Sequence, residues 1–200
     1  MQVVIIKYNA GNTKSVEHAL HRIGIQPVIS DDAEVIRMAD KVIFPGVGHA
    51  ETTMKHLKEL RLDEVIRQLK QPFLGICLGQ QLMCSHSEEG DVECLNIFPV
   101  KVKKFQSEPL QQGNHPKIPH MGWNTIRQLS SPLFKGVDEK DYVYFVHSYY
   151  CEKNDYAIST CDYILPFAAA IRKDNFYAVQ FHPEKSADTG GRILENFINI

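Results

Sequence analysis

The chain has 200 residues, of which 44% are hydrophobic, and its 22 basic and 24 acidic residues give a formal net charge of −2. This length suits one well-buried core and is short for two, so we expect a single domain over residues 1–200. The nearly balanced charge disfavours a nucleic-acid-binding protein, which needs a clustered basic face.

The N-terminus and the cysteines predict a cytoplasmic protein. The first residues, "MQVVIIKYNAG", hold too short an apolar run for a signal peptide, and no later stretch is long enough to span a bilayer. The five cysteines form no C-x-x-C pair, and we expect free thiols. No histidine falls in a pattern such as H-E-x-x-H, so neither a metal nor a cofactor is expected.

The first half of the sequence alternates strand and helix patterns. Apolar runs predict strands at 3–8, 26–30, 41–46 and 72–76. Helical spacing predicts helices at 13–24 with an N-cap at Asn12 or Thr13, at 31–40 with an N-cap at Asp31, and along the face Leu62, Val65, Ile66 and Leu69. Strands separated by helices predict an α/β fold whose mostly parallel sheet is covered on both faces.

The second half of the sequence is mainly strand-like. Strands are predicted at 98–105, 142–150, 156–160, 167–173 and 176–181, followed by a helix at 190–200 whose Ile193, Leu194 and Phe197 face inward. We expect antiparallel strands from this half to extend the sheet. The segment at 107–117 is predicted to be an exposed, mobile loop.

One cysteine lies between two glycines at the end of a predicted strand, in "GICLG". A nucleophile on such a strand-to-helix turn takes a strained backbone conformation, and the flanking glycines let the strand and helix approach. The helix that follows Cys77, predicted from about Gly79 to His86, would favour the thiolate with its N-terminus. The alternative is an ordinary tight turn with a buried thiol.

Two further segments offer the groups that a cysteine nucleophile needs. In "VQFHPEKS", His182 follows an apolar strand, and Glu184 could orient its imidazole as the third group of a triad. In "FPGVGHA", the glycines at 46 and 48 could let backbone amides face a ligand, as an oxyanion hole requires. No glycine pattern typical of a phosphate-binding loop occurs.

The segments "PGVG", "GICLGQQLM" and "FHPEKS", in this order, resemble the class I glutamine amidotransferases, cysteine enzymes that release ammonia from L-glutamine for a synthase. Three more, "KIPHMGWN", "YFVHSYY" and "HSEEG", resemble the glutaminase subunits of imidazole glycerol phosphate synthases, from histidine biosynthesis. The resemblance covers nearly the whole chain and implies the flavodoxin-like α/β fold of that family.

The resemblance also implies a role for each matching residue. Cys77 would be the nucleophile, His182 the general acid and base, and Glu184 the orienting carboxylate. The backbone amides of Val47 and Leu78 would form the oxyanion hole, after a rearrangement that the glycines of the segment make easy. The residues implied in binding glutamine are Gly46, Gly48, Gln81, His147, Ser148 and Tyr149.

A cyclase partner with a (β/α)8 barrel is implied as well, forming a heterodimer that makes imidazole glycerol phosphate and aminoimidazole carboxamide ribonucleotide. Trp123 would anchor the interface, with Asn12 and Asn124 on the same docking face, although packing of Trp123 in the core is an equal alternative. The sequence departs from the family at Lys7 to Asn9 and at Asp91 to Asn96, which puts partner docking and a mid-chain turn in doubt.

Four other functions stay open on the sequence alone. The first two are the glutaminase component of another amidotransferase pathway and a free-standing γ-glutamyl hydrolase on the same fold. The others are a binding module without activity and a flavodoxin-like cofactor carrier, for which the first strand-to-helix loop lacks phosphate-binding glycines.

Overall fold

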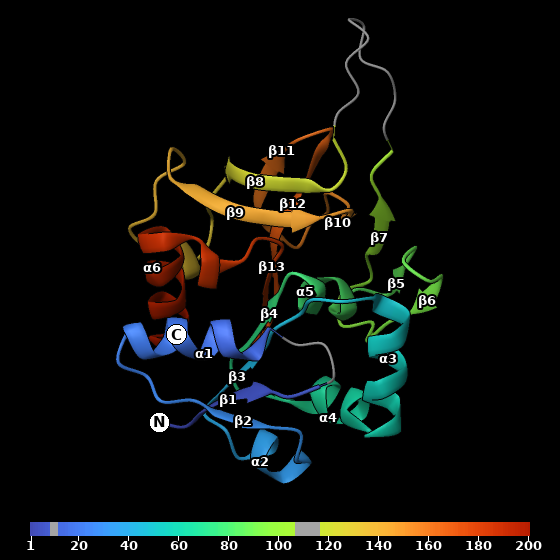
Figure 1. Ribbon diagram of the computed structural model, residues 1–200, viewed down its shortest axis with the longest axis vertical. Coiled ribbons are helices and arrows are strands. Elements are labelled where there is room, and N and C mark those ends of the chain that lie inside the picture. The colour runs from blue at the N-terminus through green and yellow to red at the C-terminus, as the bar shows by residue number, and fades with distance from the viewer. Residues whose placement is uncertain (9–11, 107–116) are drawn as a thin grey trace, which may run out of the picture.

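A seven-stranded sheet forms the centre of the computed structural model, which describes residues 1–8, 12–106 and 117–200 (Figure 1). Its strands are β1 (Val3–Ile6), β2 (Val28–Ser30), β3 (Lys41–Phe44), β4 (Phe73–Ile76), β11 (Ala157–Asp162), β12 (Pro166–Lys173) and β13 (Phe176–Val179). They lie in the order β11-β12-β13-β4-β3-β1-β2. The five strands from β13 to β2 are parallel, and β12 and β11 add antiparallel strands at one edge.

Helices cover both faces of this sheet (Figure 1). One face carries α1 (Thr13–Arg22) and α6 (Ala187–Ile198); the other carries α2 (Ala33–Arg37), α3 (Ala50–Glu59), α4 (Leu62–Gln68) and α5 (Leu78–Met83). The alternation of side chains along each strand divides the core accordingly, because Val3 and Ile5 pack toward α1 whereas Val4 and Ile6 pack toward α2. The predicted α/β fold with a mostly parallel sheet is confirmed.

Two smaller sheets contain the remaining strands. The four-stranded sheet has the order β10-β7-β5-β6 and consists of β5 (His86–Ser87), β6 (Val92–Glu93), β7 (Lys101–Lys104) and β10 (Tyr149–Cys151). The two-stranded sheet pairs β8 (His120–Thr125) with β9 (Tyr142–His147). The expectation that the antiparallel strands extend the main sheet is therefore right for β11 and β12 alone, since the run at 142–150 divides at Ser148 between the two small sheets.

Several predicted element boundaries need correction. Asp32, not Asp31, caps α2, because its Oδ1 accepts the backbone N–H of Glu34 at 2.8 Å and of Val35 at 3.3 Å. The helix after Cys77 ends at Met83 instead of His86, since Cys84 is extended and leads into β5. Helix α3 was not predicted.

Of the other predictions, one for the C-terminal helix is confirmed and one for a loop lies outside the described residues. In α6, Ile193, Leu194 and Phe197 are fully buried, as predicted. The expected loop at 107–117 falls, apart from Lys117, outside the described residues. Among the residues that the structure describes, no helix is long and apolar enough to cross a membrane.

Candidate active site

Cys77 lies on the turn between β4 and α5 in a left-handed backbone conformation, with φ 53° and ψ −108°. A non-glycine residue with such a φ is strained, as the sequence predicts for a nucleophile on this turn. A Cβ atom on Gly75 would lie 2.5 Å from Met83 Sδ, and one on Gly79 would lie 2.2 Å from the Phe44 carbonyl oxygen. The two glycines therefore let the nucleophile helix pack directly on β3 and β4.

Cys77 as a residue is 6% exposed, and it lines a pocket of about 300 Å³. The sulfur of Cys77 lies 3.9 Å from the carbonyl oxygen of Val146 and 3.6 Å from the side-chain nitrogen of Gln180, and it also interacts with the imidazole of His182. The thiol is thus buried, as in an ordinary turn, but it faces a cavity in which a small molecule can reach it.

His182 lines this pocket and Glu184 lies behind it; Glu184 belongs to the short helix η2 (Pro183–Lys185), and His182 is the residue before that helix. The imidazole Nδ1 donates to Glu184 Oε1 at 2.7 Å, and both side chains are 1% exposed. The backbone N–H of His182 donates to the carbonyl oxygen of Tyr144 at 2.8 Å, which ties the segment to β9. The imidazole therefore has a fixed orientation, with Nδ1–H directed at the carboxylate.

The second imidazole nitrogen, Nε2, interacts with the Cys77 sulfur mainly through charge and not through a well-aligned hydrogen bond. Burial lowers the pKa of His182, but the charge and hydrogen-bonding interaction of Cys77, together with those of Glu184, outweigh burial and raise the pKa to about 10. By normal hydrogen-bond geometry, Nε2 has no partner among the described residues. Catalytic hydrogen bonds are often loose before substrate binds, so this arrangement suits an imidazolium beside a thiolate.

Asn12 also contacts the carboxylate. It begins α1 without capping it, and its Nδ2 instead donates to Glu184 Oε1 at 2.9 Å. The guanidinium of Arg22 donates to the backbone carbonyl of Glu184 at 3.4 Å. The start and end of α1 thus both hold the segment that carries the acid.

Two adjacent glycines of α6 give a test of how tightly this segment is held. A Cβ atom on Gly190 would lie 1.9 Å from the Pro183 carbonyl oxygen, whereas one on Gly191 would meet nothing within 4 Å. We expect Gly190→Ala to lower the free energy of unfolding by about 1 to 3 kcal/mol, because backbone must move. Gly191→Ala should raise it by roughly 0.5 to 1 kcal/mol, since alanine favours a helix. Urea denaturation of both variants measures the difference, and equal stabilities would contradict this packing.

The glycine-rich segment at 45–48 lies against the nucleophile turn. The backbone N–H of Leu78 donates to the Gly46 carbonyl oxygen at 3.3 Å. The hydroxyl of Tyr8 donates to the Pro45 carbonyl oxygen at 2.5 Å and also hydrogen-bonds with the backbone of Val47. The backbone groups of Val47 and Leu78, which are predicted to form the oxyanion hole, therefore already make hydrogen bonds to other residues of the chain.

The pocket brings together nine of the predicted site residues: Val47, Gly48, Cys77, Leu78, Gln81, His147, Ser148, Tyr149 and His182. Gly46 does not line it, because it is buried against Leu78 and Gly79. Glu89, Pro119 and Val146 line it as well and were not predicted. Glu89 is the acidic member of this lining, and its Oε2 accepts the backbone N–H of Ala50 at 2.8 Å. Glu89 belongs to the motif "HSEEG", but its place at the pocket becomes visible only in the folded chain.

A hydrogen-bonded chain of neutral side chains supports the pocket wall. The carbonyl oxygen of Tyr149 accepts from His147 Nδ1 at 2.7 Å and from Gln81 Nε2 at 2.9 Å. His147 Nε2 must then accept from His120 Nδ1, which lies 3.0 Å away. Burial lowers the pKa of His120 to about 4 and that of His147 to about 3, so both imidazoles are uncharged at neutral pH.

The residues predicted to meet a partner differ in their exposure. Trp123 is 52% exposed, so the alternative of core packing is wrong. Its ring packs edge-on against that of Tyr144, with 5.8 Å between the ring centroids. Together with Met121 and Tyr142, which are also exposed, Trp123 forms an apolar surface patch on β8 and β9, which we call the docking patch after its predicted role. The side chain of Asn124 points to the other face of β8, where its Nδ2 donates to the Asp162 carbonyl oxygen at 3.0 Å.

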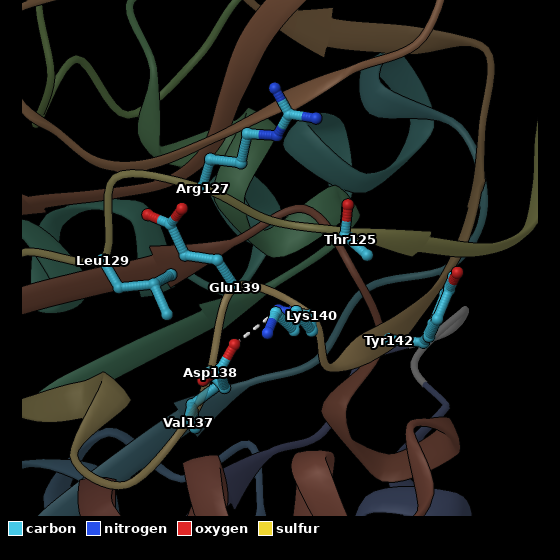
Figure 2. A pocket seen from close by; sticks show the side chains of 8 residues that line it. All are labelled: Thr125, Arg127, Leu129, Val137, Asp138, Glu139, Lys140 and Tyr142. Carbon is cyan, nitrogen blue, oxygen red and sulfur yellow. Dashed lines mark hydrogen bonds between the residues drawn. The ribbon is translucent and has the colours of Figure 1, made fainter.

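A larger pocket, of about 740 Å³, lies between β8, the loop before β9 and β9 itself (Figure 2). It is lined by Thr125, Arg127, Leu129, Val137, Asp138, Glu139, Lys140 and Tyr142, and the backbone N–H of Lys140 donates to Asp138 Oδ1 at 2.9 Å. This lining holds no thiol or imidazole and shares no residue with the Cys77 pocket. Size therefore does not identify the reactive site here.

A thiol on a strained turn, an imidazole beside it and a carboxylate behind the imidazole define the site of a cysteine hydrolase. Residues 4–200 match the family model for class-I glutamine amidotransferases. The chain is 58% identical to the "Imidazole glycerol phosphate synthase subunit HisH" of Bacteroides thetaiotaomicron and 57% identical to the protein of the same name from Bacteroides fragilis, with 100% of both chains covered. A solved glutamine amidotransferase from Thermotoga maritima shares the fold, with a TM-score of 0.61 at 19% identity over 100% of this chain and 83% of that one.

The chain belongs to the class I glutamine amidotransferase family and, within it, to the imidazole glycerol phosphate synthase HisH subunits. The resemblance that the motifs indicate is thereby confirmed, as is the enzyme class.

Proposed function

We propose that this chain is the glutaminase subunit of an imidazole glycerol phosphate synthase, and that it hydrolyses L-glutamine to glutamate and ammonia with Cys77, His182 and Glu184. The observation that carries the proposal is a thiol and an imidazole that line one pocket, with the carboxylate of Glu184 behind the imidazole at 2.7 Å from it. A cytoplasmic location is part of the proposal.

The reaction divides into two steps at the sulfur. The thiolate of Cys77 attacks the side-chain amide carbon of glutamine, the carbon–nitrogen bond breaks, and His182 protonates the departing ammonia. A water molecule, which gives its proton to His182, then attacks the thioester carbon; the carbon–sulfur bond breaks, glutamate leaves, and the thiolate and imidazolium of the starting state are restored. Glu184 stabilises the imidazolium that this cycle requires.

The oxyanion hole has to be assembled before turnover. The amide of Leu78 must release the Gly46 carbonyl oxygen, and the backbone of Val47 must turn from Tyr8 toward the pocket. Gly48, with φ at +122°, gives the segment the conformational freedom for this movement. In its described state the enzyme should therefore hydrolyse glutamine slowly.

The pocket offers complementary groups for the amino-acid end of glutamine. Both N–H groups of Gln81 are used, by Tyr149 and Gln180, so its Oε1 remains as an acceptor at the pocket. We assign Gln81 Oε1 and the carboxylate of Glu89 to the α-ammonium group, which needs acceptors. The His147–Tyr149 segment and Gly48 complete the wall around the substrate.

We further propose that a cyclase with a (β/α)8 barrel binds over the docking patch and receives the ammonia directly. Trp123 and Glu184 line a common pocket of about 580 Å³, so a partner seated on Trp123 lies near the back of the triad. Asn12 donates a hydrogen bond to Glu184, so a partner that moves Asn12 would also change the position of the carboxylate. Large exposed aromatic side chains are typical anchors of such interfaces.

A glutaminase assay with and without a purified cyclase partner and its ribonucleotide substrate tests the proposal. We expect slow glutamate release by the chain alone and a strong increase when partner and ribonucleotide are both present. Full activity of the isolated chain would instead indicate a free-standing hydrolase. Stimulation by the cyclase of another pathway would indicate a different synthase.

A further inference from the structure

Gln180 is a fully buried amide that touches the reactive sulfur. It follows β13, and its backbone N–H donates to the Ala169 carbonyl oxygen at 2.8 Å. Its side-chain Nε2 donates to Cys77 Sγ at 3.6 Å, and its Oε1 accepts from Gln81 Nε2 at 3.0 Å. This side chain thus joins the nucleophile to a residue of the substrate pocket.

The carbonyl oxygen of Tyr149 fixes which group donates and which accepts in these hydrogen bonds. The carbonyl oxygen of Tyr149 can only accept, so the amide nitrogen of Gln81 has to face it. The second proton on that nitrogen then points at Gln180 and requires an oxygen there. The amide of Gln180 must therefore present its N–H to the sulfur, because a flipped amide would place two donors against each other.

The same contact changes its strength when the thiol ionises. A neutral thiol donates weakly to the carbonyl oxygen of Val146, 3.9 Å away, and is a weak acceptor. A thiolate only accepts, and an N–H that points at it forms a stronger, charge-assisted hydrogen bond. The side-chain N–H of Gln180 is aligned with this sulfur by hydrogen-bond geometry, whereas the imidazole of His182 interacts with the sulfur without such alignment.

We propose that Gln180 is a second N–H donor, beside His182, that stabilises the Cys77 thiolate, and that the carbonyl oxygen of Tyr149, acting through Gln81, keeps this donor aimed at the sulfur. A hydrogen bond to the charged form favours ionisation. The inference rests on the proposed function, because it matters only where Cys77 reacts as a thiolate. It adds a residue to the triad and connects thiolate formation to the residues that line the glutamine pocket.

Alkylation of Cys77 by iodoacetamide, followed across pH by mass spectrometry of the Cys77 peptide, tests this without any need for turnover. Methionine in place of Gln180 keeps the length of the side chain and removes the donor. We expect Gln180→Met to move the midpoint of the pH–rate profile upward by about one pH unit, so that alkylation below that midpoint slows about tenfold. Gln180→Glu, which presents an oxygen to the sulfur, should slow alkylation as well.

The neighbouring buried amide provides a matched control. Gln80 is also fully buried, but its Nε2 donates to the Ala168 carbonyl oxygen at 3.3 Å instead of to the sulfur. Gln80→Met should therefore leave the Cys77 profile unchanged. The titratable groups that face the sulfur, His182 and the hydroxyl of Tyr8, are present in every variant, as is the neutral His147.

The outcomes separate this inference from the proposed function. A wild-type alkylation profile in either Gln180 variant that retains its native circular dichroism spectrum would overturn the role of Gln180, even if Cys77→Ser abolishes glutaminase activity. An equal shift in Gln80→Met would overturn it too, since the effect would then be general loosening of the core. Loss of the proposed function would instead show as undiminished glutaminase activity in Cys77→Ser.

Discussion

Cys77→Ser should reduce partner-stimulated glutamate release by at least about a thousandfold while the protein keeps its fold. The hydroxyl of serine is a far weaker acid than a thiol, so neither His182 nor the turn could generate an effective nucleophile from it. The change in volume is small, and the left-handed backbone at 77 tolerates serine no worse than cysteine. Glutamate release measured with the cyclase partner present checks the result.

Cys94→Ser is the matched control for this variant. Cys94 is also buried, but it lies outside the pocket, and its sulfur contacts the Val92 carbonyl oxygen at 3.6 Å. Burial raises the pKa of its thiol to about 12, so it stays protonated in the assay. We expect near-normal activity from Cys94→Ser, and continued glutamate release by Cys77→Ser would refute the assignment of the nucleophile.

Glu184→Gln should lower the rate of glutamate release by about 100- to 10,000-fold. The carboxylate accepts hydrogen bonds from both His182 Nδ1, at 2.7 Å, and Asn12 Nδ2, at 2.9 Å. An amide that turns its nitrogen toward the imidazole would favour the wrong tautomer, in which Nε2 is protonated and cannot accept a proton. Loss of the negative charge should also lower the pKa of His182 from about 10, because Glu184 is one of the two residues that raise it.

Two measurements check the Glu184 prediction. Enzyme kinetics gives the rate, and an NMR titration of the His182 imidazole gives the fall in its pKa, a change that a merely structural role would not produce. Glu64→Gln, an exposed substitution on α4, serves as the control for loss of one acid. An unchanged imidazole pKa in Glu184→Gln would contradict the electrostatic role of this residue.

The nucleophile turn could be predicted from the sequence because it is local. Gly75, Cys77 and Gly79 lie within five residues, and the clash that a Cβ would cause at either glycine arises where β4 and α5 meet. His182 and Glu184 were candidates from their place after an apolar strand, and the order of the motifs indicated the family and with it their roles. Their meeting with Cys77 further depends on β13 lying beside β4, a pairing that no local pattern determines.

The supporting hydrogen bonds could not be predicted, because they join residues far apart in the chain. Gln180 is 103 residues from Cys77, and Gln81 is 68 residues from the Tyr149 carbonyl group that orients it. A buried glutamine in an apolar strand carries no signal of its own until its partners are known. Glu89 was missed for the same reason, since only the folded pocket shows that its carboxylate lines the substrate site.

Strand alternation explains a further difference between sequence and structure. Trp123 and Asn124 are adjacent in the motif, and both were predicted to lie near the docking face. Successive side chains of a strand point to opposite faces, so on β8 the indole is exposed while the amide of Asn124 bonds within the chain. The motif identifies the segment, and the strand geometry decides which of its side chains a partner can reach.

Trapping of the covalent intermediate is the most direct test of the central claim. The chain, its cyclase partner and the ribonucleotide would be mixed with isotope-labelled glutamine, quenched in acid during turnover and digested for mass spectrometry. The account predicts a γ-glutamyl thioester on the peptide that carries Cys77, and its loss in Cys77→Ser. Steady glutamate release with no label on that peptide at any quench time, or label on another residue, would contradict it.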